Sequence, residues 1–291
     1  MPQLDGVEHR YVDVLGAKLH VAEAGSGSPV LLVHGWPQHW WVWRKVIPEL
    51  AEEHRVICVD LRGFGWSEAP PDPYELPDLA SDLLALLDVL GLERVDLIGH
   101  DWGGYAGFLL CLRAPERIDH YLAMGIIHPW FEPPPPTPKA LRRLAYQFLM
   151  AAPGVGAGTL RFLPAFVRAV LEKASHPDTK WTRAELDCFA ESFRAPDHAR
   201  ASSRLYRSFL GREAPRLRAG HYRSQRLTVP TRLLTGEADR VIRPAALEGF
   251  QPYVDEMSLE VVPGAGHFIA EERPDIVLAR ARELFGSVAS T

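Results

Sequence analysis

The chain has 291 residues, of which 47% are hydrophobic and 24% are charged, and this composition excludes extended disorder. The net charge of −5 argues against broad binding to nucleic acid or to an anionic membrane surface. No apolar run is long enough for a transmembrane helix, so we expect no stable membrane insertion.

The N-terminus and the cysteines predict a cytoplasmic protein. Residues 1–10 mix charged residues with no apolar core, unlike a secretory signal. The cysteines, Cys58, Cys111 and Cys188, are odd in number and widely spaced, which predicts reduced, buried thiols. No Cys/His cluster has the spacing of zinc ligands, and we expect no metal.

Residues 10–24 alternate apolar and polar side chains around Leu15-Gly16, which predicts a β-hairpin. After it, short apolar runs typical of buried parallel strands alternate with amphipathic stretches of helical period. The predicted strands are 30–33, 55–60, 95–98 and 117–125, and the predicted helices are near 40–53 and at 76–90 and 103–113. This alternation predicts an α/β fold with a mostly parallel sheet flanked by helices.

The alternation stops at a proline-rich segment, 129–138, which contains four consecutive prolines at 133–136. Prolines cannot enter the interior of a helix or a sheet, and from there to about residue 225 the pattern is only helical. The alternation resumes with strands at 229–234 and 258–262 and helices at 244–253 and 274–285. We therefore predict an α/β core, residues 1–128 and 227–291, interrupted by an all-helical cap, residues 129–226.

The segment 194–226 of the predicted cap contains nine arginines and only two acidic residues, Asp197 and Glu213. A solvated cap surface that pairs with the acidic core is the favoured interpretation. A docking patch for an anionic substrate or partner is the alternative.

A sharp turn follows the predicted strand 95–98. Its sequence, Gly99-His100-Asp101-Trp102-Gly103, has the form G-x-nucleophile-x-G. Small residues beside the central residue let the nucleophile protrude and let strand and helix pack closely. Its place between a strand and a helix favours this interpretation over an ordinary helix N-cap for Asp101.

The central residue is aspartate where serine is usual, and this changes the chemistry. A serine that attacked a saturated carbon would form an ether, which water does not readily cleave. A carboxylate is ionised at pH 7, and its attack on a saturated carbon forms an ester that water can hydrolyse. Asp101 therefore predicts displacement at an alkyl carbon, either ring opening of an epoxide or loss of a halide.

Hydrolysis of that ester needs a base and an acid that orients the base. His267 lies in the glycine-rich stretch 264–268 after the last predicted strand, and we expect it to be the base rather than a surface histidine. Asp239 follows the preceding strand and is the expected acid, with Glu237 as the runner-up. The order Asp101, Asp239, His267 matches the nucleophile–acid–histidine order of the α/β-hydrolase fold.

Two backbone N–H groups are expected to stabilise the oxyanion that forms during hydrolysis: those of Trp36, in the loop after an early strand, and of Trp102. The two tryptophan side chains are expected to line an apolar pocket. We expect the neighbouring His34 and His100 to brace these loops rather than to act in catalysis.

With these motifs the chain resembles the epoxide hydrolases of the α/β-hydrolase superfamily over nearly its whole length. The motifs that carry the resemblance are His34-Gly35-Trp36-Pro37, Asp60-Leu61-Arg62-Gly63-Phe64-Gly65-Trp66-Ser67, His100-Asp101-Trp102-Gly103 and Gly266-His267-Phe268. The resemblance implies an α/β-hydrolase fold with an inserted helical cap.

In that family two cap tyrosines hold the epoxide oxygen and help to open the ring. The resemblance assigns these roles to Tyr146 and Tyr206, which would otherwise be interpreted as core aromatic residues. Phenolic O–H groups can donate to the alkoxide that forms and supply its proton. The expected substrate pocket is formed by Trp36, Trp102, Gln147 and Phe268.

The resemblance implies conversion of an epoxide to a vicinal diol through an ester on Asp101, without a cofactor. A haloalkane dehalogenase with the same triad is the alternative, because Trp102 can donate to a halide and the Trp36 indole is a candidate second donor. A non-catalytic ligand-binding protein is the third hypothesis, which the complete triad disfavours. The expected partners are a small hydrophobic epoxide and water, and a homodimer is left open.

Overall fold

The computed structural model describes residues 1–133 and 138–286. Its core is an eight-stranded sheet in the order β1-β2-β4-β3-β5-β6-β7-β8. The strands are β1 (Glu8–Val14), β2 (Ala17–Ala24), β3 (Ser28–Val33), β4 (His54–Val59), β5 (Val95–His100), β6 (Ile118–Met124), β7 (Thr231–Gly236) and β8 (Met257–Val262). Strand β2 pairs antiparallel with β1 and β4, and all other pairs are parallel. The predicted mostly parallel sheet is therefore confirmed.

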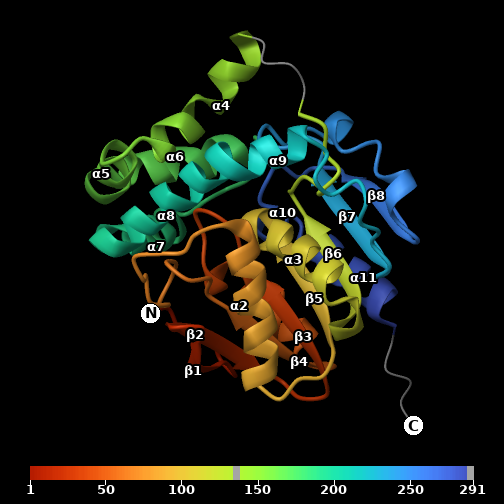
Figure 1. Cartoon of the computed structure of the whole chain (residues 1–291). Coiled ribbons are helices and arrows are strands. Elements are labelled where there is room, and N and C mark those ends of the chain that lie inside the picture. The colour runs from red at the N-terminus through yellow and green to blue at the C-terminus, as the bar shows by residue number, and fades with distance from the viewer. Residues whose placement is uncertain (134–137, 287–291) are drawn as a thin grey trace.

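Helices cover both faces of this sheet (Figure 1). Helices α2 (Leu76–Val89) and α3 (Asp101–Arg113) pack side by side on one face, and α11 (Pro274–Phe285) packs against β6 on the other. Helix α2 begins with a capping box between Glu75 and Asp78 and buries its leucine stripe. Helix α3 is buried along nearly its whole length, which places its first residue at the centre of the molecule.

Between β6 and β7 the named elements of the described chain are all helical, and they lie over the carboxyl ends of the parallel strands (Figure 1). They are α4 (Pro138–Ala151), α5 (Val155–Phe162), α6 (Pro164–Ala174), α7 (Arg183–Glu191), α8 (Pro196–Ser208) and α9 (Ala214–Arg218). A π-helical turn, Phe209–Glu213, joins α8 to α9. The predicted proline run at 133–136 lies mostly outside the described residues.

Two of the predicted helices are wrong. The segment 40–53 forms a 3₁₀ turn, Trp40–Trp43, and one short helix, α1 (Ile47–Leu50), because the backbone bonds between them span three residues rather than four. The segment 244–253 forms only the 3₁₀ turns Pro244–Ala246 and Gln251–Tyr253. Gly249 interrupts it with a φ of +90°, and Pro252 has no N–H to donate.

The cysteines are not all buried as expected. Cys58 and Cys111 are buried, whereas Cys188 on α7 is half-buried. All three are free thiols.

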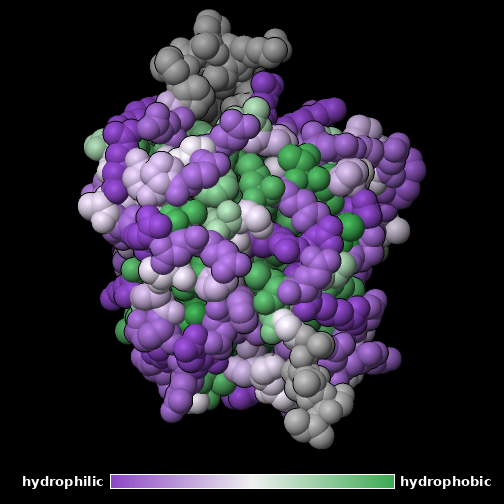
Figure 2. All heavy atoms as spheres, turned by 90° about the vertical axis from the view of Figure 1, so that its right-hand side faces the viewer, coloured by the Kyte–Doolittle hydropathy of each residue, from purple (hydrophilic) through white to green (hydrophobic). Residues whose placement is uncertain are grey.

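Figure 2 shows the face of the molecule on the side of β8. Hydrophilic residues cover most of it, and apolar residues form small, separate areas between them. Within residues 1–133 and 138–286, the helices are all too short or too polar to cross a bilayer.

Candidate active site

Asp101 begins α3 immediately after β5, in a turn that demands an unusual backbone. Its φ is +49°, a left-handed conformation that is costly for a residue other than glycine. A Cβ at Gly99 would lie 2.8 Å from the Cα of Gly104, and one at Gly103 would lie 2.3 Å from the carbonyl oxygen of His34. The glycines are therefore required by the close approach of strand, helix and loop around Asp101.

The structure brings the three predicted triad residues together from three separate loops. Nδ1 of His267 lies 3.0 Å from Oδ2 of Asp239, and Nε2 lies 3.7 Å from Oδ1 of Asp101. The second oxygen of Asp239 accepts the backbone N–H groups of Val241 (2.7 Å) and Ile242 (2.9 Å). These bonds hold the carboxylate of Asp239 in place. Asp239 in turn orients the imidazole of His267, so that its Nε2 faces Asp101.

Glu237, the runner-up acid, lies elsewhere. Its side chain is half exposed and accepts the N–H of Gly264 at 2.8 Å. Glu237 thus binds the first residue of the loop that carries His267, residues 264–268, which we call the histidine loop. Its carboxylate makes no contact that would orient the imidazole of His267. Among the residues the structure describes, no three His, Cys, Asp or Glu side chains are grouped as metal ligands.

The charge of His267 is set by its two carboxylate neighbours. Burial disfavours the imidazolium, but Asp239 and Asp101 outweigh this effect and raise the pKa of His267 to about 10. Before reaction His267 therefore carries a proton on each ring nitrogen, between the side chains of Asp101 and Asp239. Any step that removes the charge of Asp101 lowers the pKa of His267 and releases its proton more easily.

The backbone around the nucleophile carries the expected donors. The N–H of Trp36 donates to Oδ2 of Asp101 at 2.9 Å. The N–H of Trp102 lies in the first turn of α3, where backbone N–H groups have no acceptor within the helix. An oxygen of the Asp101 carboxyl group is thus already placed where an oxyanion would be stabilised.

His34 and His100 brace these loops. Nε2 of His34 accepts the N–H of Leu61 at 3.0 Å, so its proton is on Nδ1, which donates to the carbonyl oxygen of Gly35. Nε2 of His100 donates to the carbonyl oxygen of His267 at 2.9 Å. Burial and the nearby His267 lower the pKa of His100 to about 4, so this brace stays neutral at physiological pH.

The two cap tyrosines meet the core tryptophans at the same place. Tyr146 comes from α4 and Tyr206 from α8, and their ring centroids are 6.0 Å apart. Tyr206 packs edge-on against Trp36 at 5.3 Å and against Trp102 at 5.5 Å, and Tyr146 stacks on Trp36 at 6.2 Å. The four rings form an aromatic cluster beside Asp101, to which both halves of the molecule contribute.

Both phenols remain protonated in this environment. Burial, with Asp101 nearby, raises the pKa of Tyr146 to about 12. Burial, followed by Tyr146 and Asp101, raises the pKa of Tyr206 well above its ordinary value. Each tyrosine is therefore an O–H donor at neutral pH.

The remaining expected pocket residues occupy different places. Gln147 is nearly buried and donates from Nε2 to the hydroxyl of Tyr146 at 3.3 Å. Phe268 has His100, His267 and Trp181 as its aromatic neighbours, so its ring packs against the histidine loop.

Two further aromatic residues border this cluster and were not predicted from the sequence. Phe193 lies 6.4 Å from Trp36, and Phe209 lies 4.9 Å from Trp102, measured between ring centroids. Phe193 belongs to the 3₁₀ turn Ser192–Arg194, and Phe209 begins the π-helical turn. Neither turn has a sequence period that marks which side chain faces the site.

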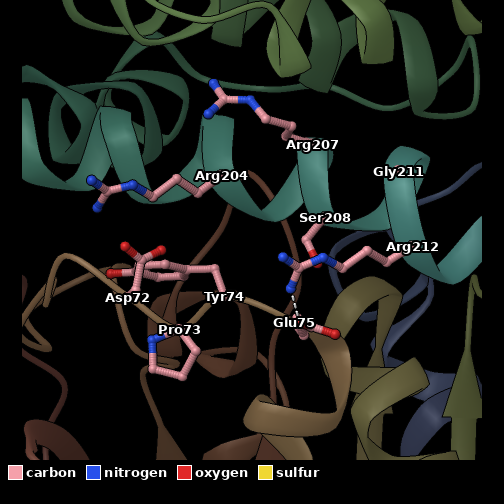
Figure 3. Close-up of a pocket in the computed structure, with 9 residues that line it drawn as sticks. All are labelled: Asp72, Pro73, Tyr74, Glu75, Arg204, Arg207, Ser208, Gly211 and Arg212. Atoms are coloured by element: carbon pink, nitrogen blue, oxygen red, sulfur yellow. Dashed lines mark hydrogen bonds and ion pairs between the residues drawn. The ribbon is translucent and has the colours of Figure 1, made fainter.

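The Arg-rich segment borders a separate hollow of about 470 Å³ between cap and core, shown in Figure 3. It is lined by Asp72, Pro73, Tyr74, Glu75, Arg204, Arg207, Ser208, Gly211 and Arg212, and contains no triad residue. Glu75 of the core forms an ion pair with Arg212 and lies 3.3 Å from Arg216. Arg226 pairs with Asp255 in the same way. These three arginines pair with the core as the favoured interpretation expected, whereas other arginines of the segment pair with acidic residues of the cap itself: Arg194 with Glu191, Arg200 with Asp197 and Arg223 with Glu132.

Comparison with known proteins agrees with this geometry. Residues 28–274 match the model of a family described as the alpha/beta hydrolase fold. A soluble epoxide hydrolase from Corynebacterium sp. (strain C12) is 30% identical, over 96% of this chain and 97% of the relative. Epoxide hydrolase 2 of Siraitia grosvenorii is also 30% identical, over 93% of this chain and 96% of the relative.

A solved structure titled epoxide hydrolase CorEH without ligand has a TM-score of 0.85 and 28% identity, and the match covers 96% of this chain and 98% of that one. The sheet order, the aspartate at the strand-to-helix turn and these relatives all lead to the same assignment. The chain belongs to the α/β-hydrolase fold family and, within it, to the epoxide hydrolases.

Proposed function

We propose that this protein hydrolyses a small hydrophobic epoxide to a vicinal diol through a covalent ester on Asp101, with water as the second reactant and no cofactor. The observation that carries the proposal is a carboxylate at the nucleophile position with an imidazole and two phenols converging on it. A carboxylate is suited to attack on a saturated carbon, and the phenols are suited to receive the oxygen that leaves it.

In the first step, Oδ1 of Asp101 attacks a ring carbon, and the C–O bond of the epoxide breaks. Oδ2 is held by the N–H of Trp36 and becomes the ester carbonyl. The ring oxygen remains attached to the substrate as an alkoxide, and Tyr146 and Tyr206 donate to it. One of them transfers its proton, and the resulting phenolate recovers a proton from solvent later in the cycle.

In the second step, water attacks the ester carbonyl. Formation of the ester neutralises Asp101, and the pKa of His267 falls because one of the two carboxylates that raise it has lost its charge. The imidazolium releases its Nε2 proton to solvent, and the neutral Nε2 then takes a proton from the attacking water while Asp239 stabilises the imidazolium that forms again. The N–H groups of Trp36 and Trp102 stabilise the oxyanion. Its collapse breaks the bond between the carboxyl carbon of Asp101 and the alkyl oxygen, which takes a proton from the imidazolium and completes the diol. The carboxyl group of Asp101 then gives its own proton to His267, which restores the carboxylate and the imidazolium.

Haloalkane dehalogenation remains the second candidate because of one feature of the site. The buried indole N–H groups of Trp36 and Trp102 have no hydrogen-bond partner among the described residues, and such groups can hold a halide. The same holds for Trp40 and Trp43, which are fully buried in the hydrophobic core. Unpartnered indoles are therefore not specific to the site, and the paired tyrosines favour the epoxide.

One experiment tests both candidates. The purified protein is incubated with a racemic aryl epoxide and, separately, with a chloroalkane, and diol and chloride are measured. We expect diol and no chloride; release of chloride without diol would support the dehalogenase.

The covalent step is tested with His267→Gln, which removes the base but leaves Asp101. Intact-mass spectrometry should show an increase equal to the mass of the epoxide. The control is His221→Gln, an exposed histidine of the cap, which should turn over without trapped adduct. An unmodified His267→Gln protein, after incubation with an epoxide that the wild type converts, would refute the ester intermediate.

A further inference from the structure

Glu272 ends the short helix α10 (Ile269–Glu272), five residues after the base. Its carboxylate accepts four hydrogen bonds. Two come from the backbone N–H groups on either side of His267, those of Gly266 and Phe268, both at 2.8 Å. The other two come from the cap, from the N–H of His176 at 2.6 Å and the hydroxyl of Thr179 at 3.0 Å.

The cap segment that Glu272 holds is also in direct contact with the histidine loop. The N–H of His267 donates to the carbonyl oxygen of Ala174 at 2.8 Å. A Cβ at Gly266 would lie 2.4 Å from the backbone nitrogen of His176. The base is therefore held by its acid partner on one side and by the connection between α6 and α7 on another.

We propose that Glu272 is the positioning residue that fixes the His267 loop against the cap, so that Nε2 is correctly placed for attack of water on the ester. This inference rests on the proposed function, since it assigns Glu272 to the second step of that reaction. Nε2 lies 3.7 Å from Oδ1 of Asp101. Catalytic groups must be held within about 0.5 Å of their productive positions. A displacement of about 1 Å can cost about 10²-fold in rate.

The four bonds require a carboxylate rather than an amide. Oε2 accepts the bonds from His176, Thr179 and Gly266, and Oε1 accepts the bond from Phe268. A glutamine has one oxygen and one NH₂ group at these two positions. Whichever way its amide is turned, the NH₂ group faces hydrogen-bond donors and cannot accept from them. Glu272→Gln keeps the size of the side chain and disrupts only this arrangement.

The first measurement separates the two steps of the reaction. Single-turnover kinetics with the aryl epoxide should show ester hydrolysis at least about 10-fold slower in Glu272→Gln, with ester formation changed by less than about 3-fold. Adduct on Asp101 should then accumulate in the steady state. Thr179→Val, which removes one of the four donors, should change hydrolysis in the same direction by less.

Glu237→Gln is the matched control. Glu237 also accepts an N–H of the same loop, but this is a single bond, from Gly264, which the carbonyl oxygen of a glutamine can still accept, and Glu237 does not bond to the residues that flank His267. We expect wild-type rates for both steps. Equal slowing of both steps in Glu272→Gln, or wild-type hydrolysis in it, overturns the assignment.

The second measurement does not depend on the reaction. Amide hydrogen exchange should rise in segments 174–179 and 264–268 in Glu272→Gln and remain near wild type there in Glu237→Gln. If His267→Gln traps no adduct, the proposed ester mechanism fails, and exchange still tests whether Glu272 ties the two segments together. Unchanged exchange in both segments overturns the inference.

Discussion

The candidate active site joins two regions that are built on different principles. Asp101, Asp239 and His267 come from loops that follow β5, β7 and β8 at one edge of the sheet. Tyr146 and Tyr206 come from the faces of two cap helices. In the core, the parallel sheet brings the loops together whatever their exact lengths. In the cap, the tyrosines meet only because the packing of α4 on α8 sets their register.

The two regions also differ in charge. The core residues form a row of carboxylate, imidazole and carboxylate, held by hydrogen bonds from the backbone. The cap contributes neutral phenols that pack on tryptophan rings. We therefore expect changes in the cap to affect ring opening with little effect on folding, and changes at the strand ends to affect both.

The largest effect that isolates the cap is expected from the double variant Tyr146→Phe with Tyr206→Phe. It removes both donors to the alkoxide and keeps the rings that pack on Trp36 and Trp102. Ring opening should slow by about 10²–10⁴-fold, the range typical of a lost general acid. Single-turnover ester formation measures the rate, and thermal unfolding should show a Tm close to that of the wild type.

Tyr222→Phe controls for the loss of a buried phenol. The Tyr222 hydroxyl donates to Glu213 at 2.7 Å, in a separate hydrogen-bonded group with Tyr105. The Tyr222→Phe variant should open the epoxide ring at the wild-type rate. If the double variant opened epoxides at the wild-type rate, the two cap tyrosines would have no role in ring opening.

The same division explains what could be predicted from the sequence. Asp101 was identified because a strand, a glycine-flanked turn and a helix follow one another directly, and only small residues fit the close contacts at Gly99 and Gly103. Loops after successive strands then pointed to Asp239 and His267, since such loops meet at one edge of the sheet. These are local patterns whose meaning does not depend on packing.

The cap could not be predicted in this way. A tyrosine on an amphipathic helix has the same pattern whether it fills a core or faces a substrate, so Tyr146 and Tyr206 came only from the resemblance to a family. Phe193 and Phe209 lie in turns with no helical period. Glu272 sits next to Glu271 in a four-residue helix, and only the folded structure shows that its partners are a loop and a cap segment.

At the strand ends, Gly103→Ala should damage fold and activity together. The added methyl group would lie 2.3 Å from the carbonyl oxygen of His34, which belongs to backbone and cannot rotate away. We expect a loss of about 3 kcal/mol in the free energy of unfolding, the upper part of the usual range for overpacking, measured by denaturant titration.

Gly158→Ala in α5 is the matched control, because a Cβ there meets nothing within 4 Å. It should stabilise the protein by about 0.5–1 kcal/mol, because alanine favours the helix. If the two variants were equally stable, the tight contact at the strand end would not constrain the nucleophile turn.

A further prediction concerns the charge of His267, and it is tested by stability rather than by rate. Its pKa is raised from 6.5 to about 10 in the folded protein, where burial is outweighed by Asp239 and Asp101. Because the folded state binds this proton more tightly than the unfolded state, the stabilisation is fully present below pH 6.5 and is lost as the pH rises toward 10. His267→Gln removes this contribution but leaves the other titrating groups in place. The difference in Tm between wild type and His267→Gln should therefore be largest near pH 6 and shrink steadily toward pH 10, by about 2–4 °C for each kcal/mol lost. A difference that stays constant over this range would mean that the imidazole is neutral in the free enzyme, so that no cation lies between Asp101 and Asp239.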